Sequence, residues 1–201
     1  MRWSRFSLRF LMIVTTLVAV WVSTVQQEIF HANRVSDIRG ELVRRRIDIT
    51  LQSGRFARLR RLVGDQNTDD IVAVEAHGFN GRGPLDEDFK LFKNLRRLKS
   101  INFDYTIISD AALVHISHLH VQQLSLIQSK ITDNCLSSLV RMRKLEELNL
   151  RNTRITDKSV EGLSAMSHLK RLDVSYTRIT AQGASQLETR LPGCTVIWKQ
   201  P

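Results

Sequence analysis

Residues 145–168 read LEELNLRNTRITDKSVEGLSAMSH, and Leu169 begins the same pattern again with LKRLDVSYTRIT. Two earlier copies of the apolar pattern precede these. The four copies start at positions 98, 121, 145 and 169, which are 23, 24 and 24 residues apart. A fixed period of this length indicates a solenoid, because one such unit cannot bury its apolar face alone and must stack on its neighbours.

Each unit is expected to form a strand, a turn and a short helix. The opening L-x-x-L-x-L alternates as a half-buried strand does, and a Ser or Thr three residues later can bond backbone groups in its turn and in the adjacent unit. Ser-Asp or Thr-Asp then precedes an apolar run with helical spacing, which predicts a helix start. The predicted fold is therefore α/β, a right-handed solenoid with a parallel sheet on its concave face and helices on its convex face.

The units at the two ends are irregular. Ile71 opens an earlier unit with a longer loop, and Ala181 replaces the aspartate in the last unit. Thr195–Trp198 is expected to close the sheet as an edge strand, with Trp198 sealing the final unit. We therefore expect a cap at residues 47–70 and a repeat domain with its C-terminal cap at residues 71–201.

Residues 10–25, FLMIVTTLVAVWVSTV, carry no charge and follow a basic flank, residues 1–9, that holds three arginines. With the preceding apolar residues they are long enough for an uncleaved transmembrane signal-anchor, although a cleaved signal peptide and a buried core helix are the alternatives. Residues 26–46 are expected to form a juxtamembrane helix. The flanking arginines favour the N-terminus inside by a small margin, which would put the repeats outside the cytoplasmic membrane of a single-pass protein.

The formal net charge of +10 is spread along the chain, which argues against nucleic-acid binding. The densest basic patch, residues 39–61, is either a solvated arginine-rich helix pair or a surface for anions. The two cysteines, Cys135 and Cys194, suggest no disulfide framework and no metal spacing, and we expect two free, buried thiols. Cys135 aligns with Ala112, Ser159 and Gly183, so this position is expected to be tightly packed.

The units resemble the ribonuclease-inhibitor-like and cysteine-containing classes of leucine-rich repeats. In particular, three stretches are similar to those of short bacterial membrane-anchored repeat proteins. They are the repeat pattern L-x-x-L-x-L-x-x-T-x-I-T-D-x-x-L, the lead-in LRRLVGD (59–65) and the tail Leu-Pro-x-Cys-x-Val. The resemblance covers about residues 55–198. Its motifs are specific for the fold and nearly silent on function.

Outward strand positions should line the concave face, where repeat proteins bind partners. The first column is Ala73, Ser100, Gln123, Glu147 and Arg171, the second is Glu75, Asn102, Ser125, Asn149 and Asp173, and the third is His77, Asp104, Ile127, Arg151 and Ser175. The candidate binding residues are Asn102, Asp104, Gln123, Glu147, Asn149, Arg151, Arg171 and Asp173, with Tyr105 and Tyr176 near the edge. The same pattern also suits a solvated polar sheet face.

Two motifs that suggest other chemistry are weak. Residues 77–83, HGFNGRG, follow a strand, but the glycine order is wrong for a phosphate loop and acids occupy the first turn of the next helix. His115, His118 and His120 lack a carboxylate partner for a metal. We find no nucleophile–base–acid set and expect no cofactor, metal or enzymatic activity.

The sequence thus predicts a non-catalytic, membrane-tethered protein-interaction module that binds an unidentified protein on its concave face. A structural envelope protein without a specific ligand is the alternative, and an enzyme in an irregular loop is the third possibility.

Overall fold

The computed structural model describes residues 16, 19, 20, 22–24, 26, 27, 37–41, 48–53, 69–76, 85–95 and 97–200. The chain divides into two compact units, Met1–Asp37 with Ser53–Asp70, and Ile38–Gln52 with Ile71–Pro201. The second unit holds the repeats. Among the described residues, no helix is long and apolar enough to cross a membrane. The predicted anchor and its basic flank fall largely outside these residues, as does most of the expected juxtamembrane helix, so these boundaries stay predictions.

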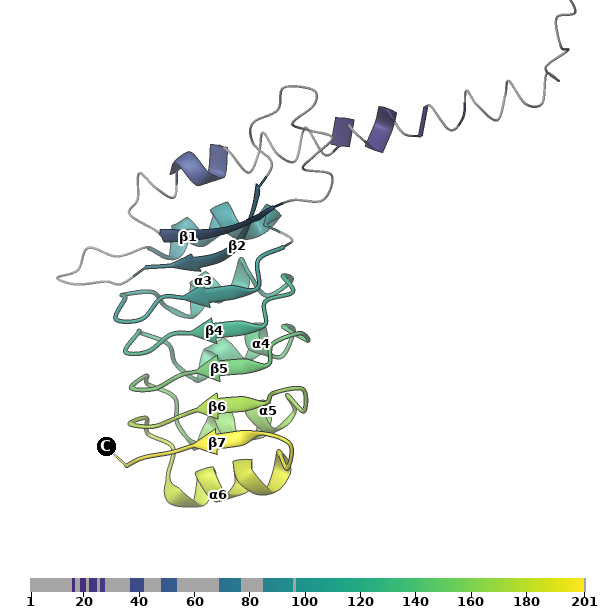
Figure 1. Ribbon diagram of the computed structural model, residues 1–201. Coiled ribbons are helices and arrows are strands. Elements are labelled where there is room, and N and C mark those ends of the chain that lie inside the picture. The colour runs from purple at the N-terminus through teal and green to yellow at the C-terminus, as the bar shows by residue number, and fades with distance from the viewer. Residues whose placement is uncertain are drawn as a thin grey trace, which may run out of the picture. The chain divides into compact units, whose positions relative to one another are not determined.

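The strands that the structure describes form one sheet in chain order (Figure 1). From β2 to β7 every neighbouring pair is parallel, and residues one repeat apart face each other, as Leu124, Leu148 and Leu172 do. The predicted solenoid of stacked parallel strands is therefore confirmed. The strands are β1 Asp48–Ser53, β2 Asp69–Glu75, β3 Ser100–Asn102, β4 Gln123–Ser125, β5 Glu147–Asn149, β6 Arg171–Asp173 and β7 Thr195–Ile197.

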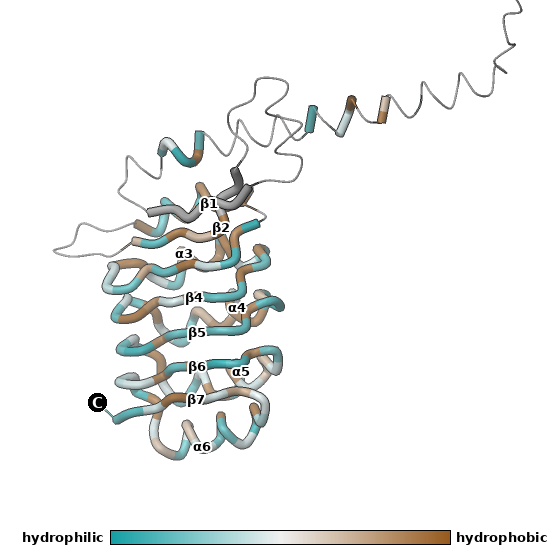
Figure 2. The backbone as a smooth tube through the Cα atoms, in the orientation of Figure 1, coloured by the Kyte–Doolittle hydropathy of each residue, from teal (hydrophilic) through white to brown (hydrophobic). Residues whose placement is uncertain are grey.

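Short helices lie behind the sheet and close the core (Figure 1). They are η2 Asp86–Asn94, α3 Asp110–Val114, η3 Asp133–Cys135, α4 Leu136–Leu139, η4 Asp157–Ser159, α5 Val160–Ser164 and α6 Ala181–Arg190. In η2, η3 and η4 the helix is of the tight 3₁₀ type, which is common in short helical segments. Each strand, with the turn and helix that follow it, forms one coil of the solenoid. Figure 2 shows hydrophilic and hydrophobic residues interspersed around the coils.

The core is built from the same positions in every coil. The middle residue of each short strand from β3 to β6 is buried, for example Leu148 at 1% exposure and Leu172 at 0%. In the first coils Phe89, Phe92 and Phe103 meet edge to face with ring centroids 5.0–5.7 Å apart. Burial of these apolar side chains is the main force that holds one coil on the next.

The predicted helix starts are confirmed. Ser109, Thr132, Thr156 and Thr180 are the N-caps, and each side chain accepts a hydrogen bond from a backbone N–H in the first helical turn. The buried turn hydroxyls also behave as predicted within their own coil, since Thr153 donates to the Leu150 carbonyl at 2.6 Å. The side-chain bonds that hold each N-cap to the preceding coil instead come from aspartates, which the repeat pattern alone did not predict.

The C-terminal end closes as predicted. β7 pairs in parallel with β6, and the indole N–H of the half-buried Trp198 donates to the Ile179 carbonyl at 2.9 Å. This bond ties the last residues of the sheet to the turn of the preceding coil.

Candidate protein-binding surfaces

The open face of the sheet, defined as the face opposite the helices, carries the first two predicted columns. The strand register aligns both columns as expected. A shallow hollow of about 310 Å³ lies over them. Six of the ten candidate residues line it together: Asn102, Gln123, Glu147, Asn149, Arg171 and Asp173.

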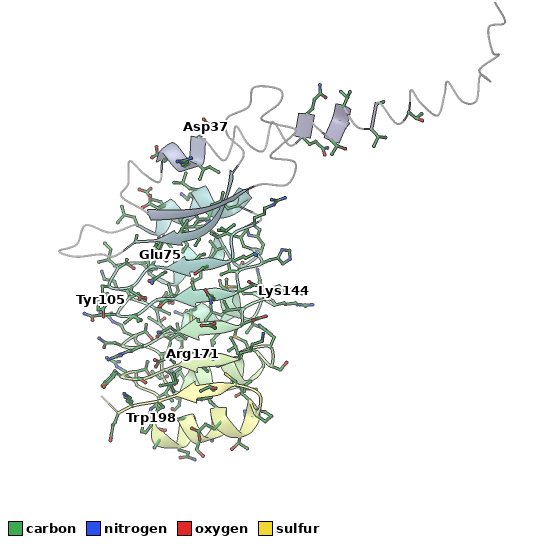
Figure 3. The ribbon with its side chains drawn as sticks, viewed as in Figure 1. Asp37, Glu75, Tyr105, Lys144, Arg171 and Trp198 are labelled. Carbon is green, nitrogen blue, oxygen red and sulfur yellow. The ribbon has the colours of Figure 1, made fainter. Side chains whose placement is uncertain are left out.

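The chemistry of this hollow is polar and, on balance, acidic. Arg171 is the one cation in its lining, against Glu75, Glu147 and Asp173. Gln123 donates from Nε2 to Oε1 of Glu147 at 3.1 Å. The outward side chains of Gln123, Glu147 and Arg171 are exposed, so they offer charges and hydrogen-bonding groups to a ligand. Figure 3 shows Glu75 and Arg171 on strands at different heights of the sheet.

Three side chains of the second column are partly used by the fold. Oδ1 of Asn149 accepts from the backbone N–H of Arg151 at 3.1 Å, and Oδ1 of Asp173 accepts from that of Ser175 at 2.9 Å. Asn102 makes the same bond to the residue two positions on. These bonds start the turn after each strand and leave part of each side chain free to bind.

The third column differs from the prediction. Asp104 is only 7% exposed, because its Oδ1 accepts hydrogen bonds from the Ser125 hydroxyl at 2.6 Å and the Ile127 N–H at 2.9 Å. The expectation that Asp104 is exposed on this face was therefore wrong. Ser175 is likewise buried, and His77 lies outside the described residues.

The remaining candidates, Arg151, Tyr105 and Tyr176, lie on a separate surface. They line a hollow of about 400 Å³ with Gln128 and Asn152, beside the turns that follow the strands. The guanidinium of Arg151 stands 4.8 Å from the centroid of the Tyr176 ring, within the range of a cation–π contact. We call this surface, together with the adjoining hollow that Lys130, Arg154 and Arg178 line, the turn edge.

The backbone of the turn edge has an unusual conformation. Its residues Tyr105, Gln128, Asn152 and Tyr176 have φ angles of 59°, 55°, 55° and 59°. Asn enters this left-handed region more readily than most residues, whereas a bulky side chain there is rare. Each N–H donates to a carbonyl of the next coil, as Tyr105 does to Ile127 at 2.7 Å. The sequence placed Tyr105 and Tyr176 near the edge but did not predict this backbone conformation, for which Asn152 is the only signal.

Other chemistry finds little support in the described part of the chain. No group of three or more His, Cys, Asp or Glu there could hold a metal ion. The ring of His118 instead bonds the Lys93 carbonyl through Nε2 at 3.0 Å. Residues 77–84, which include the glycine-rich loop, lie outside the residues that the structure describes.

The two cysteines have different surroundings. Cys135 is free and 1% exposed, whereas Cys194 is free but only half-buried, which corrects the expectation that both are buried. Burial raises the pKa of Cys135 to about 12, and the charges of Asp110 and Asp133 act in the same direction. Its thiol is therefore neutral at neutral pH and is a packing group rather than a nucleophile.

A family model described as Leucine Rich repeat matches residues 141–164 and 165–187. With the repeat register described above, this match shows that the chain contains leucine-rich repeats. Leucine-rich repeat domains generally mediate protein–protein interactions and are typically non-catalytic. A search of curated proteins found no match to the sequence.

Solved structures with a similar fold include an internalin C2 from Listeria monocytogenes, 19% identical with a TM-score of 0.46 over 55% of this chain and 46% of that chain. A second internalin from the same organism is 20% identical with a TM-score of 0.43, over 54% and 30%. The ectodomain of the receptor kinase SOBIR1 from Arabidopsis thaliana is 9% identical with a TM-score of 0.45, over 77% and 79%. The chain spans less than half the length of either internalin.

Proposed function

We propose that this protein is a non-catalytic interaction module that binds a protein partner on the open face of its sheet. The observation that carries the proposal is the hollow on that face, where exposed side chains from consecutive coils stand on a backbone fixed by parallel pairing. The hollow is shallow and open, whereas small-molecule sites are usually deep and mainly apolar. A broad polar surface of this kind suits a protein partner.

The partner's surface should complement an acidic field. Glu75, Glu147 and Asp173 outnumber Arg171, so a ligand with a basic centre is favoured. Such charges mainly set specificity and the rate of association.

We further propose that residues 10–25 tether the module to the cytoplasmic membrane, with the repeats on the extracytoplasmic side. The support is the uncharged run and the arginines before it. Protease treatment of intact cells tests this arrangement. Digestion of the repeats without cell lysis is expected, and their protection until lysis would contradict it.

A charge swap tests binding on the open face. Glu147 and Arg171 are register partners on β5 and β6, so Glu147→Arg with Arg171→Glu inverts the local pattern and keeps the net charge. After cross-linking in cells, the full-length protein should capture a partner that the swapped variant loses.

The matched control swaps Glu146 and Lys170, which form an exposed ion pair at 2.7 Å beside the hollow but do not line it. This variant should keep the partner. If neither the parent protein nor the control captures any protein, the structural alternative without a specific ligand is favoured instead.

A further inference from the structure

We infer that the turn edge is a second binding surface, which takes an acidic, extended segment of a protein. The inference stands on the turn edge alone and does not require a ligand on the open face. Its first observation is a column of exposed cations. Lys130, Arg154 and Arg178 occupy the same position in consecutive coils, and all three are exposed.

The cations stand on a fixed backbone. The N–H groups of Lys130, Arg154 and Arg178 donate to carbonyls of the preceding coil at 2.9, 2.9 and 3.0 Å. Neighbouring strands of a sheet lie about 4.8 Å apart, so the three positions should span about 10 Å. A ligand would therefore meet a preorganised row of positive charge, with little backbone entropy left to lose on binding.

The surroundings add positive charge and aromatic surface. The cations line a hollow of about 570 Å³ that also includes Tyr105 and Tyr176, and Arg151 lines the adjoining hollow. No acidic residue lines either hollow. Within the described chain, no carboxylate forms an ion pair with Lys130, Arg154 or Arg178. The nearby aspartates of the turns are already bonded to the N-caps of the next coils.

The dimensions fit an extended peptide. Tyr105 and Tyr176 lie three coils apart, which corresponds to about 14 Å, and an extended chain covers this distance in about four to five residues. Carboxylates on alternate residues of such a peptide would face the cations, and its apolar groups could contact the two rings and Ile107, which is 41% exposed.

A protein segment fits this surface better than a nucleic acid. The cations form one narrow column, whereas nucleic-acid binding calls for a broader basic field. The neighbouring open face is acidic on balance and would repel a phosphate backbone that extended beyond the turn edge.

Fluorescence anisotropy on the full-length protein in detergent tests the inference. The probe is a labelled peptide of about ten residues with alternating Glu and Thr, and the neutral comparison replaces Glu by Gln. We expect saturable binding of the acidic peptide that weakens as salt is added, and little binding of the neutral one.

Two triple variants locate the site. Lys130→Glu, Arg154→Glu and Arg178→Glu together should weaken binding at least about tenfold, because three attractions become repulsions. The control, Arg143→Glu, Lys144→Glu and Arg190→Glu, changes the net charge equally at exposed positions that do not line the turn-edge hollows. In Figure 3, Lys144 and Tyr105 lie at opposite ends of the strands.

Tyr176→Asn gives an independent check, because Asn152 already occupies the same left-handed position in the preceding coil. This variant should fold and bind the acidic peptide several-fold more weakly. The inference is overturned if the acidic peptide does not bind, if both triple variants weaken it equally, or if oligothymidylate of equal charge binds more tightly.

Discussion

Asp133 and Thr156 join two consecutive coils through a pair of hydrogen bonds. Oδ1 of Asp133 accepts from the Thr156 backbone N–H and Oδ2 accepts from its hydroxyl, both at 2.8 Å. The same pair recurs from Asp86 to Ser109, from Asp110 to Thr132 and from Asp157 to Thr180. Each N-cap hydroxyl is thereby held by the preceding coil while it caps its own helix. The Ser/Thr-Asp motif therefore serves two coils at once.

Removing one of these aspartates should loosen the contact between coils. Asp133→Ala leaves the Thr156 N–H and the Thr156 and Ser159 hydroxyls without their acceptor. We expect a loss of about 1–3 kcal/mol in the free energy of unfolding, measured by urea titration with circular dichroism. Hydrogen exchange of the Thr156 amide should quicken.

Ala181→Asp is the matched control for this prediction. It restores the aspartate in the last coil, where no further N-cap threonine follows. Its stability should change by less than about 0.5 kcal/mol, or rise slightly, because an acid favours the first turn of a helix. A loss equal to that of Asp133→Ala would contradict the role in joining coils.

The stability contributed by Asp133 should depend on pH in a defined direction. Burial alone raises the pKa of Asp133, but hydrogen bonds from Ser159 and Thr156 and the charge of Lys158 outweigh it, so the pKa is lowered in the folded protein. The ionised form therefore stabilises the fold above the unfolded pKa of about 3.9, and this contribution is lost as the pH falls through the folded value.

Urea titrations of the parent protein and Asp133→Asn between pH 7 and pH 3 check this dependence. The difference in unfolding free energy should stay constant from pH 7 to about 5 and shrink below about pH 4. A difference that shrinks as the pH rises from 5 to 7 would show that the carboxylate is not stabilised in its charged form.

The repeat period predicted the fold and the open face because strand alternation and a constant spacing together fix which side chains share a column. It did not predict Asp104, whose burial depends on Ser125 and Ile127 in the next coil rather than on its own position. It placed Tyr105 and Tyr176 near the edge of the concave face but did not predict the left-handed backbone there. Tyrosine has no preference for positive φ, so neither residue gave a sign of this conformation. Contacts between coils that depend on one particular side chain are not encoded in the period.

Gly183 and Gly162 should respond differently to alanine. A Cβ on Gly183 would collide with Oδ1 of Asp157, the carboxylate that holds Thr180, so Gly183→Ala should cost about 1–2 kcal/mol. A Cβ on Gly162 would meet the flexible end of Leu136 at 2.8 Å, and alanine gains about 1 kcal/mol in helix propensity there. Gly162→Ala should therefore be close to neutral. Thermal unfolding of both variants tests the contrast, which equal losses would refute.

The two thiols should differ in reactivity. Burial raises the pKa of Cys135 to about 12 and also raises that of Cys194, but Cys194 is only half-buried. With iodoacetamide at about pH 8, folded protein should be alkylated slowly at Cys194 and not at Cys135, whereas urea should expose both. Mass spectrometry of the peptides distinguishes them. Equal labelling of both in the folded protein would mean that the coil around Cys135 opens readily.

Gln128 provides a direct test of strain at the turn edge. Its φ of 55° is a conformation that costs most residues about 1 kcal/mol or more and costs glycine little. Gln128→Gly should therefore raise the unfolding free energy by up to about 1 kcal/mol, because relief of this strain exceeds the greater entropy of glycine in the unfolded chain. Lys130→Gly, two residues on at an exposed position outside this left-handed column, gains no such relief and should lower stability by about 0.5–1 kcal/mol. Urea titration of the two variants gives the sign of each change. Opposite signs are required, since destabilisation by both would mean that the turn is held without strain.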